Sequence, residues 1–469
     1  MRLTLTRRTA TSLLVAGTMF MEILDSTVIT TALPAIAKDF NTAAAHLSLG
    51  VSAYLVALTM FIPVSGWAAD RYGSRRIFSL ALVIFTLASA LCALCSNLTE
   101  FTFARVLQGL GGAMMVPVGR LVVLRDTPKQ QLVRAIAILT WPALAAPLIG
   151  PVLGGWIASH WSWHWIFILN VPLGVIALIA TQYLIPIGEQ STQDHFDLRG
   201  FLLSASGFGL FMAGIEASSR EDITLTLALS LLVVGLVILA ITTRHLLTAY
   251  NPLFNLKPLA VETFRLSVFG GSLFRIAIST APFLLPLMFQ LGFGFSPVEA
   301  GALLLWLFAG NFCMKPATTW IMNRFGFKRV LVTNGLCVAL GFAAMTQFTS
   351  DTPVWAIIIV LFISGMCRSL QFTAMNTISY SDMPKRYMRD ANTLQAVFIQ
   401  MNIGVGIAVG ALALAIACWV HGGSSTQPEL GDFQLSLWFV SVLALLAMFD
   451  SILLPKDAGF SVLKSKQAT

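Results

Sequence analysis

Residues 11–34 read TSLLVAGTMFMEILDSTVITTALP, an apolar stretch that carries two carboxylates near its middle. At a rise of 1.5 Å per residue, a helix from Leu13 to Leu33 is about 30 Å long, the hydrocarbon thickness of a typical bilayer. A charge near the bilayer centre costs roughly 3 kcal/mol on insertion scales, so acids at that depth usually face a protein-lined cavity and serve a function. Glu22 and Asp25 are therefore the first candidate functional residues.

Glu22 and Asp25 are three residues apart, which places both carboxylates on one face of a helix. Two acids crowded in a poorly solvated site are not expected both to be ionised at neutral pH, because burial and a neighbouring negative charge each favour the protonated form. The pair is a candidate proton acceptor. The alternative is a structural role, in which the acids bind a basic residue and hold helices together.

The composition predicts a polytopic membrane protein. Of 469 residues, 57% are hydrophobic and 11% are charged, and the mean hydropathy is +0.81, whereas soluble domains contain roughly 25% charged residues. The six cysteines all fall in apolar segments and are interpreted as packing residues. Arginines before the first apolar run resemble those of a signal peptide, but the run is long and contains acids, so we expect a permanent helix.

Hydropathy, together with turn and charge breaks, predicts fourteen membrane helices and an all-α fold. Because the number is even, both termini should lie on one side of the membrane. The spans are expected near 11–33, 47–69, 77–97, 101–122, 132–157, 165–186, 199–216, 224–243, 266–289, 298–322, 329–349, 354–377, 393–419 and 434–454.

Basic residues outside these spans indicate the orientation. Nearly all fall in segments on the same side as the N-terminus, and the exceptions are Lys38 and Arg220. Because cytoplasmic loops are enriched in Lys and Arg, both termini are predicted to be cytoplasmic. The net charge of +8 then reflects topology, and no nucleic acid is expected as a partner. An aromatic belt is expected at the outer surface, formed by Trp161, Trp163 and Trp165.

An internal repeat divides the chain. The loop after the second span reads GWAADRYGSRR (66–76), and the loop after the tenth reads WIMNRFGFKRV (320–330). Eight spans separate the copies, which fits two six-helix units in the same orientation with two extra helices between them. Parallel repeats with a substrate site between the halves are typical of transporters. We predict a six-helix bundle in 1–190, two extra helices and linkers in 191–260, and a second six-helix bundle with a tail in 261–469.

Both loop copies contain a glycine between basic residues, and glycine adopts positive φ without steric cost, so the chain can reverse there at once. Asp70, at the end of the second span, is interpreted as a latch that pairs with arginines or a neighbouring helix end in one conformation and releases in the other. The alternative is a solvated loop. The predicted cytoplasmic gate comprises Asp70, Arg71, Gly73, Arg75, Arg76, Asn323, Arg324 and Gly326.

The fourth span places Arg105 about 8 Å below the outer surface, and Asp25 lies about 12 Å deep by the same measure. These comparable depths predict an Arg105–Asp25 pair, which proton binding to the acid would break. The small residues of GLGG (109–112), and those of GVGIAVG (404–410), are expected to allow close helix packing.

The fifth span contains PLIGPVLGG (147–155). A proline inside a helix leaves a carbonyl unpaired and kinks the helix, and glycines let another helix approach closely. This accumulation predicts a hinge, although glycine and proline are also tolerated in membrane helices without such a role. The hinge residues would be Pro147, Gly150, Pro151, Gly154 and Gly155.

The second half carries Arg275, Lys315 and Arg368 within spans and no deep acid. With Arg105, these basic residues outnumber the two acids of the first span, which suggests a cavity for neutral, zwitterionic or anionic solutes as well as lipophilic cations. Lys315 is close enough to the cytoplasmic end to snorkel, so a structural anchor is an equal alternative. The predicted substrate cavity comprises Gln108, Arg275, Asn311, Lys315 and Arg368.

Over nearly its whole length the sequence resembles the fourteen-span drug:proton antiporter family of the major facilitator superfamily, and most of all its enterobacterial multidrug exporters. Family signatures are matched by LDSTVITTALP (24–34), GWAADRYGSRR, RVLQGLGG (105–112), PLIGPVLGG and WHWIFILNVPLG (163–174). The sequence departs from the family at Thr30 and Asn323, where an asparagine and an acid are usual, and by the additional carboxylate of Glu22.

The resemblance implies proton-driven export by alternating access, with Asp25 and Arg105 in proton coupling, Asp70 with Arg75 and Arg76 in the gate, and the fifth-span motif as the hinge. It implies a secondary transporter of the bacterial inner membrane, not an enzyme, which exports small amphipathic compounds. We expect a monomer in the lipid bilayer that uses the proton gradient and no cofactor. The sequence contains no phosphate-binding loop, nucleophile arrangement or metal-ligand cluster.

Three alternatives stay open on the sequence alone. The chain could export one endogenous metabolite or siderophore-like anion, it could drive uptake with protons, or it could be a non-transporting sensor or channel. The fifth-span signature argues against uptake by resemblance only, and a sensor or channel does not explain the repeat. The substrate itself is not encoded, because an apolar cavity with few polar groups has no sequence motif.

Overall fold

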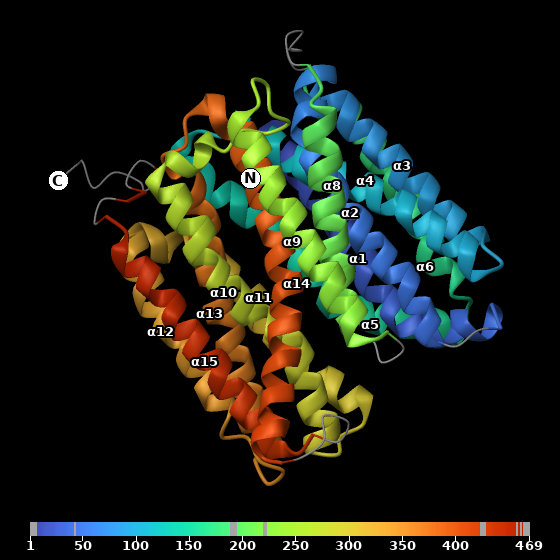
Figure 1. Cartoon of the computed structure of the whole chain (residues 1–469), viewed down its shortest axis with the longest axis vertical. Helices are drawn as coiled ribbons and strands as arrows, with labels where there is room; N and C mark the ends of the chain where they lie inside the picture. Colours follow the sequence, from blue (N-terminus) through green and yellow to red (C-terminus); the bar gives the residue numbers. More distant parts are fainter. Residues whose placement is uncertain are drawn as a thin grey trace, which may run out of the picture. The chain divides into compact units, whose positions relative to one another are not determined.

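The computed structural model of the chain consists of helices and short connections (Figure 1). It describes residues 7–41, 44–187, 195–218, 223–422, 428–455, 458–459 and 462, and no strand occurs among them. Helices are the expected solution for apolar spans, because the hydrocarbon of a bilayer offers no water to pair with backbone N–H and C=O groups. The described residues form two compact units.

The first unit comprises Met1–Thr127, Ile138–Lys257 and Pro384–Val397. Its long helices therefore include the beginning of α14 but lack the beginning of α5. The helices are α1 (Arg7–Asp39), α2 (Ala44–Tyr72), α3 (Ser74–Leu94), α4 (Leu98–Asp126), α5 (Leu132–His160), α6 (His164–Ile168), α7 (Asn170–Leu184), α8 (Leu198–Ser218), α9 (Leu225–Thr248) and α14 (Met388–Val420).

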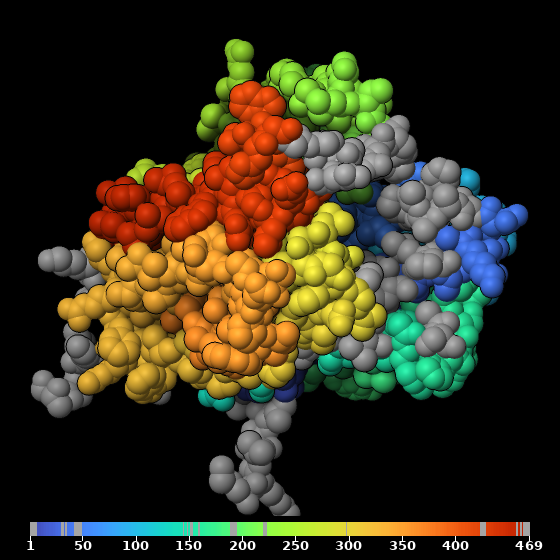
Figure 2. All heavy atoms as spheres, turned by 90° about the horizontal axis from the view of Figure 1, so that it is seen from below, coloured from blue at the N-terminus to red at the C-terminus, as the bar shows by residue number. Residues whose placement is uncertain are grey.

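The second unit comprises Pro128–Ala137, Pro258–Met383 and Phe398–Thr469. Figure 2 shows an end of this unit at which α11 (yellow) lies beside the residues that lead into α13 (orange). Its remaining helices are α10 (Glu262–Leu287), which runs into a π-helical turn (Met288–Gly292), α11 (Pro297–Phe325), α12 (Phe327–Met345), α13 (Val354–Ser381) and α15 (Leu430–Leu453).

Thirteen of the fourteen predicted spans are confirmed as helices long and apolar enough to cross a membrane. The predicted span 165–186 corresponds to the two helices α6 and α7. The other predicted span, 132–157, coincides with α5, some of whose side chains lie outside the described part of the chain. The protein is thus a multi-pass membrane protein with an all-α fold, as the sequence predicts.

The two copies of the repeat form equivalent turns. Gly73 separates α2 from α3 with φ 89°, and Gly326 separates α11 from α12 with φ 78°. Side chains other than glycine rarely adopt this left-handed region. The prediction that these glycines reverse the chain between adjacent helices is confirmed.

Close helix packing at the predicted glycines is also confirmed. A Cβ atom at Gly109 would lie 2.5 Å from the backbone oxygen of Tyr54 in α2, and one at Gly111 would lie 2.7 Å from the backbone nitrogen of Phe85 in α3. In the second unit, Gly406 of α14 packs in the same way against Ile276 of α10. Small residues thus set the spacing of α4 to two neighbours at once.

The two extra helices, α8 and α9, pack against each other, and α8 also packs against α2 (Figure 1). The Asp197 carboxylate holds their predicted cytoplasmic ends together. It accepts hydrogen bonds from the backbone N–H groups of Gly200 and Leu253, and it lies 3.0 Å from Nε2 of His245 in α9. The hairpin is therefore an integral part of the first unit.

The aromatic belt is only partly as predicted. Trp161 and Trp165 are exposed, with ring centroids 5.4 Å apart, as expected for a membrane interface. Trp163 is buried instead, and its indole N–H donates to the Asp39 carboxylate at 3.0 Å. Its inclusion in the belt was wrong, because a buried indole N–H needs an acceptor and finds one at the end of α1. Arg220 lies outside the described residues.

We predict that Gly111→Ala lowers the free energy of unfolding by about 1–3 kcal/mol, because the new methyl group meets the backbone of α3 and cannot be accommodated by a rotamer change. Gly17→Ala in α1 is the matched control, since a Cβ there meets nothing within 4 Å. Thermal unfolding of the protein in detergent measures both. Equal melting temperatures for the two variants would contradict the packing argument.

Candidate functional site

Asp25 is the centre of a buried polar cluster in the first unit. Nη1 of Arg105 donates to Oδ2 of Asp25 at 2.6 Å, while the side-chain amides of Gln108 and Asn170 donate to Oδ1 at 2.9 and 2.6 Å. The side chains of Asp25 and Arg105 are both 0% exposed. The Arg105–Asp25 pair predicted from membrane depth is therefore present, and donors from α4 and α7 surround the carboxylate on α1.

A second layer of contacts ties this cluster to α3. The Ser89 hydroxyl accepts hydrogen bonds from Gln108 at 2.7 Å and from Asn170 at 3.2 Å. The Oε1 atom of Gln108 in turn accepts from Arg105 at 2.6 Å and faces the Cys92 thiol at 3.9 Å. Four helices, α1, α3, α4 and α7, thus share one polar network, and the loss of one member would leave buried partners unpaired.

The Arg105 guanidinium depends strongly on Asp25. Its carbon lies 4.4 Å from the centre of the Tyr54 ring, a cation–π arrangement. Nε and Nη2 have no hydrogen-bond partner among the described residues. A buried cation with unsatisfied donors is costly unless a counter-ion compensates it, and Asp25 is the carboxylate that bonds to it here.

Glu22 lies one turn along α1 from Asp25. Its carboxylate sits beside the Tyr54 hydroxyl and Gly112 of α4, and it makes no hydrogen bond to Asp25 among those seen in the structure. The two acids therefore share Tyr54 as a neighbour without sharing a hydrogen bond. Glu22 is half-buried, whereas Asp25 is sealed.

At the predicted cytoplasmic end, Asp70 forms ion pairs with two arginines, as the interpretation of this residue as a latch requires in one conformation. Nη2 of Arg125, at the end of α4, donates to Oδ1 at 2.6 Å, and Nη1 of Arg389, at the start of α14, donates to Oδ2 at 3.2 Å. The Asn392 amide adds a hydrogen bond to the Pro117 carbonyl oxygen at 2.9 Å. The first turns of α14 are thereby fastened to α2 and α4.

The partners of Asp70 differ from those that the resemblance implied. Arg75 points to α7, where Nε and Nη2 donate to Oε1 of Gln182 at 3.1 and 2.8 Å. Arg76 is exposed. Neither Arg75 nor Arg76 forms an ion pair with Asp70 in the described part of the chain, and the membership of both in a gate stays a prediction. Of the other predicted gate residues, Arg324 is exposed, while Arg71 and Asn323 are half-buried.

One of the residues predicted to form a hinge in α5 makes the close helix contact expected of it, while the hinge itself stays a prediction. A Cβ atom at Gly150 would collide with the Thr27 side chain of α1. Gly155 is different, because a Cβ there meets nothing within 4 Å, so close approach at this position was a wrong prediction. Pro147 is half-buried, Gly154 is buried, and the side chain of Pro151 lies outside the described part. The helix itself continues from Leu132 to His160.

The second unit buries the three predicted basic residues. Lys315 is 3% exposed and donates from Nζ to the Thr373 hydroxyl at 2.6 Å, so the snorkelling alternative was wrong. Nη2 of Arg368 donates to the Ile278 carbonyl oxygen at 2.5 Å. Arg275 donates to backbone and side-chain oxygens of Ser267 and Asn376 at 3.2 and 3.3 Å.

Gln108 and Asn311 were also assigned to the substrate cavity. Gln108 is fully buried in the Asp25 cluster, so its assignment to an open cavity was wrong for this conformation. Asn311 is half-buried on α11, with its backbone nitrogen next to Gly365 of α13.

Among the residues around Asp25 and Asp70 that the sequence did not indicate as site residues, five have roles in the two charged clusters. They share one property, which is a polar or charged side chain within or at the end of a span. A search for polar residues at matching depth would have found those near Asp25, but the residues at the helix ends served only as topology markers. These residues are Tyr54, Ser89, Arg125, Asn170 and Arg389.

The two units of spanning-length helices, one of which contains a buried ion pair, define a polytopic membrane protein. The chain belongs to the Major Facilitator Superfamily, whose family model matches residues 15–411. It is therefore a transporter and not an enzyme, as the sequence predicts.

Among related sequences, the "Putative multidrug resistance protein MdtD" of Pectobacterium carotovorum is 36% identical over 442 residues, which cover 94% of this chain and 93% of that protein. The protein of the same name from Escherichia coli is 36% identical over 435 residues, or 92% of each chain.

Solved structures show the same fold. The human organic anion transporter MFSD10 superposes with a TM-score of 0.68 at 15% identity, covering 95% of this chain and 99% of that one. The proton:xylose symporter XylE superposes with a TM-score of 0.64 at 15% identity, covering 96% and 97% of the two chains. At this identity the likeness concerns the fold alone.

We predict that Arg105→Met destabilises the protein by about 3–5 kcal/mol, because it leaves the buried Asp25 carboxylate without its counter-ion. The double variant Asp25→Asn/Arg105→Met should recover much of this loss. Arg125→Met serves as a control for an ion pair that is partly exposed and should cost less than about 1 kcal/mol. Equilibrium unfolding in detergent gives the coupling energy, and additive effects at Asp25 and Arg105 would show that the pair is not a unit.

Proposed function

We propose that the protein is a proton-coupled antiporter that exports small amphipathic compounds across the bacterial inner membrane. The observation that supports this most is the sealed ion pair of Asp25 and Arg105 in the membrane interior. A carboxylate at that depth in a membrane usually has a function. A proton is small enough to reach a buried carboxylate, and by neutralising it a proton breaks the ion pair. Two relatives named as multidrug resistance proteins support the direction and the substrate class.

In the proposed mechanism, a proton neutralises Asp25 and removes the counter-ion of Arg105. The guanidinium then has unsatisfied donors in a dry site, so the packing of α1 against α4 and α7 loses stability relative to an alternative arrangement. Protonation thereby biases the equilibrium between two openings. Since Asp25 is 0% exposed here, water must reach it in another conformation, and we infer that this access is from the outer side.

Asp70 has the complementary role at the cytoplasmic end. Its two ion pairs, with Arg125 and Arg389, hold the start of α14 against α2 and α4. We infer that these bonds break when the cytoplasmic side opens for substrate. The same proposal includes three further features. These are cytoplasmic termini, a division of the chain into three parts at residues 190 and 260, and a hinge near Gly150.

One observation favours a second candidate, the export of an organic anion. Lys315 and Arg368 are buried, and neither forms an ion pair with an acid in the described part of the chain. An anionic substrate would compensate such charges. Proton release from purified protein on addition of organic anions, but not of cationic dyes, would favour this candidate over a broad exporter.

We predict that Asp25→Asn abolishes proton-linked efflux in inverted membrane vesicles, because asparagine keeps the shape of the site but cannot exchange a proton. The matched control is Asp126→Asn, which removes an exposed carboxylate at the end of α4 and should leave transport unchanged. Melting temperature verifies that both variants are folded. Efflux by Asp25→Asn at the wild-type rate would remove Asp25 from the mechanism.

A further inference from the structure

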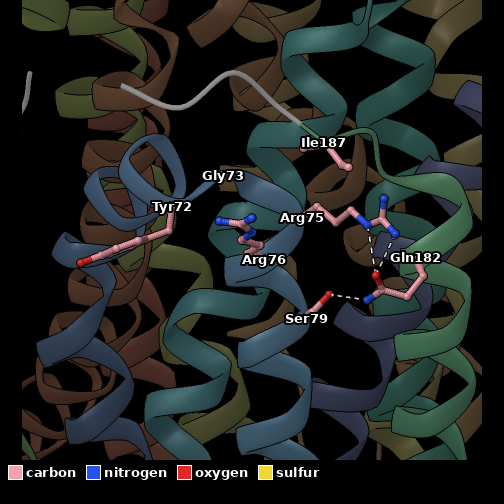
Figure 3. Close-up of a pocket in the computed structure, with 7 residues that line it drawn as sticks. All are labelled: Tyr72, Gly73, Arg75, Arg76, Ser79, Gln182 and Ile187. Atoms are coloured by element: carbon pink, nitrogen blue, oxygen red, sulfur yellow. Dashed lines mark hydrogen bonds between the residues drawn. The ribbon is translucent and has the colours of Figure 1, made fainter. Parts of the chain in front are cut away.

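A cavity of about 350 Å³ lies at the predicted cytoplasmic end of the first unit, where α2 turns into α3 beside the end of α7 (Figure 3). It contains two arginines and, among its described lining residues, no acid. The lining residues are Tyr72, Gly73, Arg75, Arg76, Ser79, Gln182 and Ile187. The gate does not use this cavity, since Asp70 pairs with Arg125 and Arg389.

The two arginines are available for a ligand. Arg75 is held in place by Gln182, which accepts from Nε and Nη2 at 3.1 and 2.8 Å and itself donates to the Ser79 hydroxyl at 2.9 Å (Figure 3). Nη1 of Arg75 and the entire guanidinium of Arg76 make no hydrogen bond or ion pair with the described residues. A guanidinium fixed in this way loses little side-chain entropy when it binds an anion, and its planar donors match a phosphate group.

An exposed apolar surface continues from the cavity toward the membrane interior. On α3, Arg76, Leu80, Leu87 and Leu91 are all exposed and lie four, seven and four residues apart, which places them on one face of the helix.

The neighbouring helix α7 extends this surface with exposed Ile176 and Ile179. The two helices are in close contact, since a Cβ atom at Gly174 of α7 would collide with Thr86 of α3. The cavity is therefore the polar end of a longer surface whose remaining length is apolar.

We propose that this cavity binds the headgroup of an anionic phospholipid of the cytoplasmic leaflet, with the acyl chains along α3 and α7. The helix ends that frame the cavity place it at headgroup level, and basic pockets at that level attract anionic lipids. A soluble phosphate would engage the arginines but would leave the apolar face unused. The inference depends on the proposed orientation of the chain and not on the compound that is exported.

The test measures lipid binding to delipidated full-length protein in detergent by native mass spectrometry. Palmitoyl-oleoyl phosphatidylglycerol is compared with phosphatidylethanolamine of the same acyl chains and with glycerol phosphate, which lacks them. We expect phosphatidylglycerol to bind best, and Arg75→Gln/Arg76→Gln to weaken it about thirtyfold. The matched control Arg199→Gln/Arg244→Gln removes two exposed arginines from α8 and α9 and should retain wild-type binding.

Three results would overturn the proposal. Phosphatidylglycerol could bind equally to the Arg75→Gln/Arg76→Gln variant and to its control, or no better than phosphatidylethanolamine. Glycerol phosphate could bind as tightly as the lipid, which would make the site one for a soluble anion. If the double variant does not fold, Arg76→Gln alone decides, because this exposed side chain has no bond to lose. None of these results bears on the exporter proposal, since transport is not the readout.

Discussion

The structure depends on one constraint, which is that a carboxylate and a guanidinium must coexist in a place without water. Asp25 and Arg105 meet at 2.6 Å with side chains that are 0% exposed. Removing either charge from water alone costs free energy. The attraction between the two charges offsets this cost only when their geometry is good and further hydrogen bonds satisfy the remaining polar atoms. Gln108 and Asn170 supply those bonds to Asp25. In the proposed mechanism, a single proton on Asp25 therefore changes the stability of the whole helix cluster.

The surrounding packing gives this cluster its rigidity. Glycines on α4 bring α2 and α3 within contact of its backbone. Side chains of α4 and α7 bond to the Asp25 carboxylate, and Ser89 of α3 supports them. The second charged cluster, around Asp70, is built differently, since Arg125 is 38% exposed and its ion pairs lie at helix ends. Partly exposed pairs are individually weak. In the proposed mechanism, the buried pair is the proton-sensitive element, and the weaker pairs of Asp70 break and form again as the carrier opens and closes.

Much of this was predictable because membrane physics restricts the sequence. The length of the apolar segments predicts the spans, and the repeated glycines predict the turns at Gly73 and Gly326. The similar depth of Asp25 and Arg105 in the membrane predicts their ion pair. The partners of Asp70 were not predictable, because Arg389 is more than three hundred residues away and only tertiary structure brings it near. Asn170 was missed for another reason, since polar residues at the depth of Asp25 were not compared. Lys315 and Trp163 show the converse. Local rules predict snorkelling for Lys315 and interfacial exposure for Trp163, but each side chain is buried and donates to a specific acceptor.

In the proposed exchange, Asp25 itself gains and loses the proton. Infrared difference spectroscopy of purified protein, recorded on addition of a transported compound, observes the carboxyl groups directly. We expect a change in a protonated-carboxyl band that disappears in Asp25→Asn and persists in Asp126→Asn. If the band survives unchanged in Asp25→Asn, another group carries the proton and the proposed mechanism is wrong.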